Sequence, residues 1–327
     1  MSIGLPVYNG EKYLEGALQS LLAQDYRHFE LIISDNASTD QTEQICLRYA
    51  ENDKRIRFYR SESNLGAAAN FNLVFRLSGG KYFMWAAHDD LWHPSYISRC
   101  LEGLRQDANV VLCASSVQFI DESGNQIPEA RWRVLLAGGY NRLHTRSLPL
   151  RDRARGLTKT LNWYALYGII RSDVLRETRL FPDRFGGDVI LLMELLFHGE
   201  TYVLDEALFS YRLVSRPPAV ESAVTGDSRQ RRLGPYTELA MSLLDTIDES
   251  CFTPDVKRGL REDLLANISL NNRVWTRLIF SENPSLARWG GPYARSARIR
   301  ALLSRVSSEI PPAARGSPAQ APPTAPA

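Results

Sequence analysis

Residues 31–40 read LIISDNASTD, and this stretch decides the fold. Its first three residues are apolar and two of them are β-branched, which favours a buried strand. Asp35 and Asn36 are residue types that form turns after strands. The order Ser-Thr-Asp-Gln at residues 38–41 is typical of a capping box, so we expect a helix that runs to about residue 50. A strand that leads through a polar turn into a helix is half of a βαβ unit.

The same alternation continues on both sides of this stretch. Strands are predicted at residues 3–7, 29–34, 56–59, 82–86 and 110–114, and helices at residues 11–23, 38–50, 67–77 and 94–105. Strands that alternate with amphipathic helices at this spacing form parallel sheets with helices on both faces. The sequence therefore predicts an α/β fold with a doubly wound, mostly parallel sheet.

The alternation weakens after residue 115, although residues 1–220 are predicted to form one domain. Residues 129–159 are rich in arginine and show little periodicity, so we interpret them as a long functional loop that either contacts anions or is a solvated basic face. Helices are expected at residues 172–178 and 188–198, and strands at 201–204 and 209–212. A helical extension is predicted over residues 221–310, with helices at 230–247, 254–280 and 293–306. The Pro- and Ala-rich tail at residues 311–327 is predicted to be disordered.

Composition limits the class of protein and its compartment. Hydrophobic residues make up 44% of the chain, charged residues 23%, and the net charge is +2, as in ordinary globular proteins. The four cysteines form no CxxC pair, which argues against a zinc site or a disulfide framework. No apolar run reaches the roughly 18–20 residues that span a bilayer, so we expect a cytoplasmic protein. Arginines and aromatic residues in the C-terminal helices are consistent with peripheral contact to the inner face of the membrane, or with packing on the main domain.

Polar side chains follow three of the predicted strands. Asn9 follows the first strand, Asp35 the second, and His88, Asp89 and Asp90 the fourth. Ligands of open α/β sheets bind outside the carboxyl ends of the strands, so these residues are expected to line one site. Adjacent carboxylates repel each other unless a cation lies between them, and Mn²⁺ or Mg²⁺ suits their hard oxygen atoms. The alternative is that Asp90 caps the next helix while Asp89 is solvated.

Four motifs in this order resemble family 2 of the nucleotide-sugar glycosyltransferases, which have the GT-A fold. They are LPVYN at residues 5–9, LIISDNASTD at 31–40, NLGAAAN at 64–70 and AHDD at 87–90. The resemblance extends to about residue 213 and implies a donor-binding half at 1–115 and an acceptor half at 116–220. His88 stands where the family's metal motif has its first acidic residue, and Ser34 replaces a common aspartate.

The resemblance also implies roles for individual residues. Asp35 is expected to accept an N–H from uracil or thymine, which suits a UDP- or dTDP-sugar donor. Asp89 and Asp90 correspond to the ligands of a Mn²⁺ or Mg²⁺ cofactor. The expected donor nucleotide-binding residues are Pro6, Tyr8, Asn9, Asp35, Asn64, Gly66, His88 and Asp89.

An inverting glycosyltransferase also needs a general base for the acceptor hydroxyl. Asp188, which follows two glycines at the start of a predicted helix, resembles the family's catalytic aspartate, although an aspartate in that place is often a helix cap. Glu194 is the second candidate. Arg212 is a weak candidate for a diphosphate contact. Trp163 and Tyr164 are expected either to stack on a sugar or to be buried aromatic residues.

The resemblance implies a hexosyltransferase that adds a sugar to a glycan or lipid-linked glycan in cell-surface polysaccharide synthesis, and we expect no nucleic-acid partner. The alternative is a catalytically inactive partner protein that binds a nucleotide sugar. A Rossmann dehydrogenase is disfavoured because no GxGxxG motif follows the first strand. A sugar-1-phosphate nucleotidyltransferase is disfavoured because residues 5–12 contain no Gly-rich phosphate loop.

Overall fold

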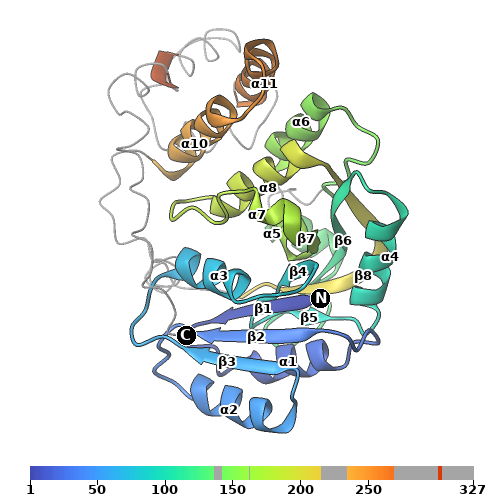
Figure 1. Ribbon diagram of the computed structural model, residues 1–327, viewed down its shortest axis with the longest axis vertical. Helices are drawn as coiled ribbons and strands as arrows, with labels where there is room; N and C mark the ends of the chain where they lie inside the picture. The colour runs from blue at the N-terminus through green and yellow to red at the C-terminus, as the bar shows by residue number, and fades with distance from the viewer. Residues whose placement is uncertain (136–141, 162, 215–233, 269–300, 304–327) are drawn as a thin grey trace.

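The computed structural model describes residues 1–135, 142–161, 163–214, 234–268 and 301–303 (Figure 1). The described strands form one eight-stranded sheet in the order β3-β2-β1-β4-β7-β6-β8-β5. The strands are β1 (Ser2–Val7), β2 (Glu30–Asp35), β3 (Ile56–Arg60), β4 (Tyr82–Trp85), β5 (Leu91–Trp92), β6 (Val110–Ile120), β7 (Ile169–Arg171) and β8 (Glu200–Arg212). The helices are α1 (Leu14–Leu22), α2 (Thr42–Asn52), α3 (Ala67–Arg76), α4 (Tyr96–Gln106), α5 (Glu129–Leu135), α6 (Leu150–Thr160), η1 (Tyr164–Tyr167), α7 (Ser172–Arg176), α8 (Gly187–His198), α10 (Pro235–Glu249) and α11 (Pro254–Ala266).

The sheet is parallel in the half that the N-terminal strands form. β1 pairs in parallel with β2 and β4, and β2 pairs in parallel with β3. β6 and β8 are also parallel, whereas β7 is antiparallel to both β4 and β6, and β5 is antiparallel to β8. The α/β class is confirmed, and β7 is the strand that joins the two parallel parts into one sheet.

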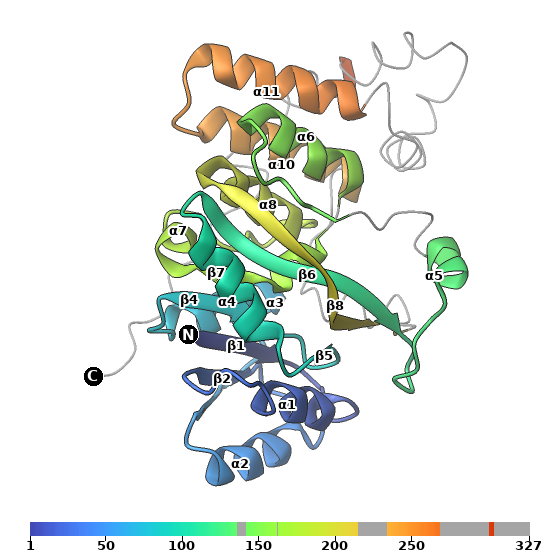
Figure 2. The same cartoon turned by 90° about the vertical axis from the view of Figure 1, so that its right-hand side faces the viewer.

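Both faces of the sheet are covered by helices, as the alternating side chains of β2 require. Leu31 and Ile33 pack with residues of α1, α2 and α4 on one face. Ile32, between them, belongs to the core of the other face, which includes residues of α3, α6, α8, α10 and α11. Figure 2 shows α1 and α2 at one end of the molecule and α10 and α11 at the other.

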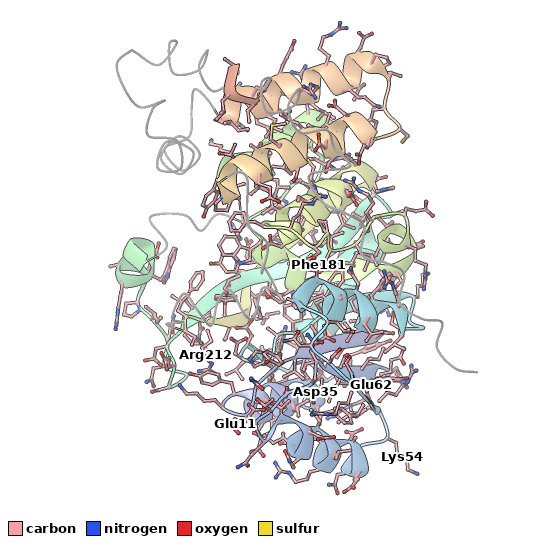
Figure 3. The ribbon with its side chains drawn as sticks, turned by 90° about the vertical axis from the view of Figure 1, so that its left-hand side faces the viewer. Glu11, Asp35, Lys54, Glu62, Phe181 and Arg212 are labelled. Carbon is pink, nitrogen blue, oxygen red and sulfur yellow. The ribbon has the colours of Figure 1, made fainter. Side chains whose placement is uncertain are left out.

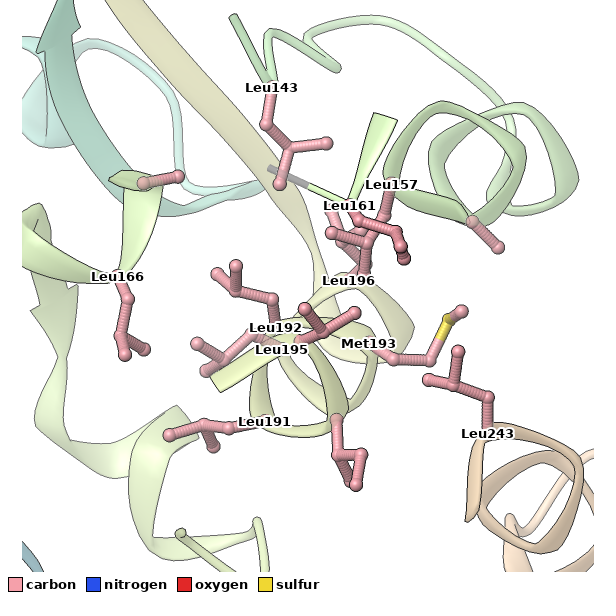
Figure 4. Close-up of a cluster of buried hydrophobic side chains, with 14 of the residues drawn as sticks. Leu143, Leu157, Leu161, Leu166, Leu191, Leu192, Met193, Leu195, Leu196 and Leu243 are labelled. Carbon is pink, nitrogen blue, oxygen red and sulfur yellow. The ribbon is translucent and has the colours of Figure 1, made fainter. Parts of the chain in front are cut away.

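Helix α8 is the centre of the second core. Its residues from Val189 to Leu196 are buried almost without interruption, which is typical of a helix with apolar side chains all round. Figure 4 shows its leucines between Leu157 and Leu161 on one side and Leu243 of α10 on the other. Because α8 is surrounded in this way, its first turn is held at a fixed place beside the sheet.

The structure corrects the prediction of a long loop over residues 129–159. Two helices, α5 and α6, form there, and α6 packs on α8 and α11. Part of the basic charge is neutralised within the chain, because Arg142 pairs with Asp205, and Arg151 and Arg155 both pair with Asp263. The sequence pattern did not indicate α6, because this helix buries only a narrow apolar stripe that includes Ala154 and Leu157.

Three smaller predictions also differ from the structure. The capping box at Ser38 is wrong, since α2 begins at Thr42 without a side-chain cap. Residues 201–204 and 209–212 belong to one long strand, β8, rather than to two. Asp90 is followed by β5 and not by a helix, so it is not a helix cap.

The described part of the C-terminal extension packs on the main domain. Helix α10 buries Leu239, Leu243 and Leu244 in the core around α8, and α11 adds Leu260 and Leu264. Of the helices predicted at residues 254–280 and 293–306, residues 269–280, 293–300 and 304–306 lie outside the described residues, as does the tail at 311–327. Among the described helices none is both long enough and apolar enough to cross a membrane.

Candidate functional site

Val7, Asp35 and Arg60 lie side by side in one row at the ends of β1, β2 and β3. In the parallel register Val7 lies beside Asp35, and Asp35 lies beside Arg60. Pro6 is buried within β1, while Tyr8 is half-buried and Asn9 exposed just beyond its end. Figure 3 shows Asp35 on the edge of the sheet toward which these strands run. The row confirms the general arrangement expected for open α/β sheets.

The Asp35 side chain is fully buried and held by three donors. Its Oδ1 accepts a hydrogen bond from the Ser38 backbone N–H at 3.0 Å and a second, very short one from the Ser38 hydroxyl. Its Oδ2 forms an ion pair with Nη1 of Arg60. Nη2 of Arg60 donates to the carbonyl oxygen of Ser38 at 2.9 Å. Ser38 therefore does not cap α2, because its hydroxyl is used to fix Asp35.

The loop that contains Asn64 and Gly66 is fastened to the end of β2 through Asn36. Nδ2 of Asn36 donates to Oδ1 of Asn64 at 2.8 Å, and Oδ1 of Asn36 accepts from the Leu65 N–H at 2.8 Å. Gly66 has a φ of 83° and occupies the N-cap position of α3. Only glycine adopts this backbone conformation readily, so it allows the chain to turn into the helix at the strand ends.

The loop after β1 is linked to the loop after β2 and lies against His88. Oδ1 of Asn9 accepts from the Thr39 N–H at 2.8 Å, and the Ser38 hydroxyl accepts from the Asn9 N–H at 2.9 Å. A Cβ atom on Gly10 would lie 2.8 Å from the His88 ring. The structure thus brings Asn9, Asp35, Asn64, Gly66 and His88 to neighbouring loops of one edge.

Asp89 and Asp90 lie in the short loop between β4 and β5, and Arg212 fixes that loop. The Arg212 backbone N–H donates to Oδ1 of Asp90 at 2.8 Å, and its Nε donates to the Asp89 carbonyl at 2.7 Å. Its Nη1 also donates to the carbonyl oxygens of Asp121 and Glu122, at 2.9 and 3.2 Å. Its guanidinium carbon also lies 4.6 Å from the centroid of the Tyr13 ring, so Arg212 ties the carboxylate loop to the turn at residues 121–122 and to Tyr13.

Sequence reasoning gave Arg212 a weak role in diphosphate binding, but its observed contacts are those of a positioning residue. We expect both Arg212→Lys and Arg212→Met to lower kcat/KM by about 10–100-fold, as is typical for groups that orient metal ligands. A lysine keeps the charge, but its single nitrogen cannot replace the two separate nitrogens, Nε and Nη1, through which Arg212 bonds the carbonyl oxygens on its two sides. Steady-state kinetics of both variants, with Arg99→Lys as an exposed control, would test this. Full activity of Arg212→Lys would show that the charge alone matters.

Asp188 lies in the first turn of α8, and its surroundings raise its pKa. Gly186, with a φ of 71°, holds the N-cap position, so Asp188 is not the cap. Burial raises the pKa of Asp188 above its ordinary value, while a 2.8 Å hydrogen bond from the Val189 N–H opposes part of this effect. A carboxylate with a raised pKa is a better proton acceptor near neutral pH.

The loop before Asp188 is joined to the strand that leads to Asp89. The ring of Phe181 contacts Trp85, the last residue of β4, with ring centroids 5.0 Å apart (Figure 3). Asn72 of α3 bonds both the N–H and the C=O of Phe181, at 3.0 and 2.9 Å. A Cβ atom on Gly186 would lie 2.7 Å from Leu239, so α10 closes the other side of this loop. The helical extension therefore helps to place Asp188.

Tyr167 lies at the end of η1, which contacts both β4 and α8. The pKa of its phenol is raised well above its ordinary value, first by burial and then by the negative charges of Tyr211, Asp90, Asp89 and Asp188. The strand that leads to Asp89 and Asp90 and the helix whose first turn holds Asp188 therefore meet at the same short segment. Sequence reasoning missed Tyr167, because its role follows only from the position of η1 beside β4.

The remaining candidates have structural surroundings. Both oxygen atoms of Glu194 bind Arg179, one to its backbone N–H at 2.8 Å and the other to its guanidinium. Tyr164 is buried against Phe119 and Tyr211, and Trp163, 37% exposed, lies against Tyr164. A hollow of about 450 Å³ between α6 and α11 is lined by Arg151 and Arg155, whose charges are already paired with Asp263. It lies on helices remote from the strand ends.

The donor set at Asp89 and Asp90 fits a hard divalent cation in part. Their oxygen atoms are of the right chemical class, and Mg²⁺ is often held by one or two carboxylates together with substrate phosphates. Within the part of the chain that the structure describes, no three His, Cys, Asp or Glu side chains gather in a way that could hold a metal ion. The residues that the structure describes therefore supply only part of a coordination shell.

A family model described as glycosyl transferase family 2 matches residues 2–171. An uncharacterised glycosyltransferase of Rickettsia conorii is 33% identical over 153 residues, which are 46% of this chain and 24% of that protein. Chondroitin synthase of Escherichia coli is 32% identical over 141 residues, which are 43% of this chain and 19% of that protein. The matched segment thus covers about a quarter or less of these two relatives.

Solved structures share the fold at low sequence identity. TarS of S. aureus, crystallised with UDP-GlcNAc, has a TM-score of 0.64 and 16% identity, over 94% of this chain and 91% of that one. The mannosyltransferase PcManGT of Pyrobaculum calidifontis, in complex with GDP-Man and Mn²⁺, has a TM-score of 0.55 and 14% identity, over 94% and 80%. The fold is that of GT-A proteins. Because the family model covers slightly more than half of the 327 residues, the chain belongs to glycosyl transferase family 2 and is a transferase enzyme.

Proposed function

We propose that the protein is an inverting glycosyltransferase that moves a sugar from a UDP- or dTDP-sugar to an acceptor hydroxyl, with Asp188 as the general base. The observation that carries the proposal is that η1 packs against both β4, which leads to Asp89 and Asp90, and α8, whose first turn holds Asp188. A metal-binding carboxylate pair and a base with a raised pKa beside one another are the two parts that such a transfer requires.

The nucleotide is proposed to bind at the ends of β1, β2 and β3. Asp35 would bind the base, Pro6, Tyr8 and Asn9 would flank it, and the α3 N-terminus beyond Gly66 would present backbone N–H groups to the donor. TarS crystallised with UDP-GlcNAc and PcManGT crystallised with GDP-Man share this fold, which supports a nucleotide-sugar donor. The proposed nucleotide-binding set also includes Asn64, His88 and Asp89.

A divalent cation, Mn²⁺ or Mg²⁺, is proposed to bind Asp89 and Asp90. PcManGT was crystallised with Mn²⁺, which supports this assignment. When bound, the cation would offset the negative charge of the diphosphate leaving group. The hydrogen bond from the Arg212 N–H to Asp90 Oδ1 would hold the loop in place for this purpose.

In the proposed reaction the acceptor oxygen attacks the anomeric carbon from the face opposite the diphosphate. Asp188 takes the proton of the acceptor hydroxyl as the new C–O bond forms. The bond between the anomeric carbon and the diphosphate oxygen breaks, and its electron pair leaves with the nucleoside diphosphate. The configuration at the anomeric carbon is therefore inverted.

The acceptor is proposed to be a glycan or lipid-linked glycan in polysaccharide synthesis. The likeness to chondroitin synthase over part of the chain supports a polysaccharide product. We also propose that the protein resides in the cytoplasm and contacts the inner face of the membrane through its basic C-terminal segment.

A thermal-shift screen of nucleotide sugars with Mn²⁺ tests the proposed donor directly. A ligand that binds only the native state stabilises it against unfolding, by about 2.7 kcal/mol when its concentration is 100 times its Kd. This stabilisation raises the melting temperature. We expect UDP- or dTDP-sugars to stabilise the protein and ATP to have no effect. NMR of the product anomer then tests inversion. Donor stabilisation without hydrolysis or transfer over a broad acceptor panel would favour the alternative of an inactive partner protein.

A further inference from the structure

The hydrogen bonds of Asp35 leave little room for a nucleobase. An ionised carboxylate has about four acceptor positions, two on each oxygen. Both positions on Oδ1 are taken by the N–H and the hydroxyl of Ser38, and one position on Oδ2 is taken by Arg60. Among the described residues, one acceptor position of Asp35 remains, on Oδ2.

Arg60 places hydrogen-bond donors directly beside that remaining position. It is the parallel-strand neighbour of Asp35, and its Nη1 and Nη2 bond Asp35 and the Ser38 carbonyl. Its Nε lies 3.6 Å from Glu43. A guanidinium has five N–H groups, so one on each terminal nitrogen is left for a ligand. The Arg60 side chain is 32% exposed, whereas Asp35 is fully covered, so an arriving base meets Arg60 first.

We propose that Arg60 is a specificity-determining residue, which together with Asp35 selects a base that has one N–H next to a carbonyl oxygen. Uracil and thymine have this pattern at N3 and O4. This inference rests on the proposed nucleotide-sugar function and concerns the base that the same site accepts. In the proposed complex Arg60 keeps its bond to Oδ2, so that one acceptor position is left for the base, and it donates a second N–H to the carbonyl oxygen of the base.

Other bases fit this arrangement poorly. Guanine has the same N–H beside a carbonyl oxygen at N1 and O6, but its N2 amino group is a further donor on the other side of N1, for which no acceptor position of Asp35 is left. Cytosine presents an acceptor nitrogen to the carboxylate and an amino group to the guanidinium, so both contacts are repulsive. A site built to bond polar groups rejects a ligand that leaves them unpaired much more strongly than an apolar pocket rejects an extra methyl group.

Isothermal titration of the full chain with UDP, CDP and GDP, each with Mn²⁺, tests the proposal. UDP and CDP differ only at the edge of the base, which makes them a matched pair. We expect UDP to bind at least about 100-fold more tightly than CDP or GDP. In Arg60→Met the affinity for UDP should fall by about 10-fold or more, because one charge-assisted hydrogen bond is lost, while that for CDP changes little.

Arg57→Met is the control, since Arg57 lies on the same strand and pairs with Glu30 at 2.7 Å, away from Asp35. It should leave all three affinities unchanged. If Arg60→Met does not fold, Ser38→Ala supplies a second test, because it vacates a position on Oδ1 and should raise the affinity for GDP relative to UDP. Equal binding of the three nucleotides, or an unchanged ratio of UDP to CDP affinity in Arg60→Met, would refute the role of Arg60 but would leave the proposed function standing. A wild-type protein that binds no nucleotide would overturn the proposed function as well.

Discussion

Asp188→Asn should abolish transfer while leaving donor binding largely intact. Removal of a general base typically costs about 10²–10⁴-fold in rate, and we expect a loss of about 10³-fold in kcat. The asparagine keeps the shape of the side chain and can still accept the Val189 N–H. The donor Kd from titration and kcat from product formation, measured on the same preparation, separate the two effects.

Asp183→Asn is the matched control, because Asp183 is an exposed aspartate in the loop before the same helix. It should retain activity within about twofold, as most exposed substitutions do. An Asp188→Asn variant with wild-type kcat would exclude Asp188 as the base. A variant that loses donor binding and activity together would indicate a structural role instead.

The raised pKa of Asp188 also predicts the direction in which kcat/KM and the stability of the fold change with pH. Asp188 acts as a base only when ionised, so kcat/KM should fall as pH drops through its raised pKa, above the value of about 3.9 for a free aspartate. Stability changes in the other direction: since the folded state holds this proton more tightly than the unfolded state, stability falls as pH rises between the two pKa values. Asp188→Asn should remove this loss, and thermal unfolding of both proteins across that window measures it.

Asp89→Asn should lower kcat strongly, because it removes a carboxylate that is proposed to bind the metal. We expect a loss of about 10²–10³-fold in kcat, comparable to the loss of one group that stabilises transition-state charge. The variant should require a higher Mn²⁺ concentration for half-maximal rate, which a titration of metal against activity measures. For the wild type, EDTA should stop turnover and added Mn²⁺ should restore it.

The control for this change is Asp205→Asn, an exposed aspartate on β8 whose carboxylate pairs with Arg142. Its metal dependence should match that of the wild type. Undiminished wild-type activity in EDTA would count against a metal at Asp89 and Asp90. An unaltered Mn²⁺ requirement in Asp89→Asn would show that Asp89 is not a ligand.

The N-terminal half of the fold could be predicted because its signals are local. Strands β1, β2 and β4 are short, mostly apolar runs, and polar residues follow each of them within a few positions. The carboxyl ends of parallel strands lie on one edge, so the proximity of Asn9, Asp35 and Asp89 follows from topology alone. Helix α6 was missed because its partners α8 and α11 come later in the chain, and its apolar stripe is narrow without them.

The roles of the arginines could not be predicted for a related reason. Arg60 and Arg212 are ordinary basic residues at the ends of strands, and no neighbouring residue in the sequence indicates which groups they bond. Arg212 lies 122 residues from Asp90, and only the return of β8 to the edge of the sheet brings them together. Ser38 shows the opposite error, because a local capping signal was overridden by the stronger attraction of the buried Asp35 carboxylate.

The sequence by itself determined the α/β class, the family and the edge of the sheet at which the site lies, since these depend on periodicity and on motifs within short segments. Tertiary structure alone decided where Asp188 lies beside the sheet. A buried α8, the Phe181–Trp85 contact and the close approach of α10 to Gly186 fix its position. Each of these contacts joins residues far apart in the chain, and packing of this kind has no signature in a local pattern.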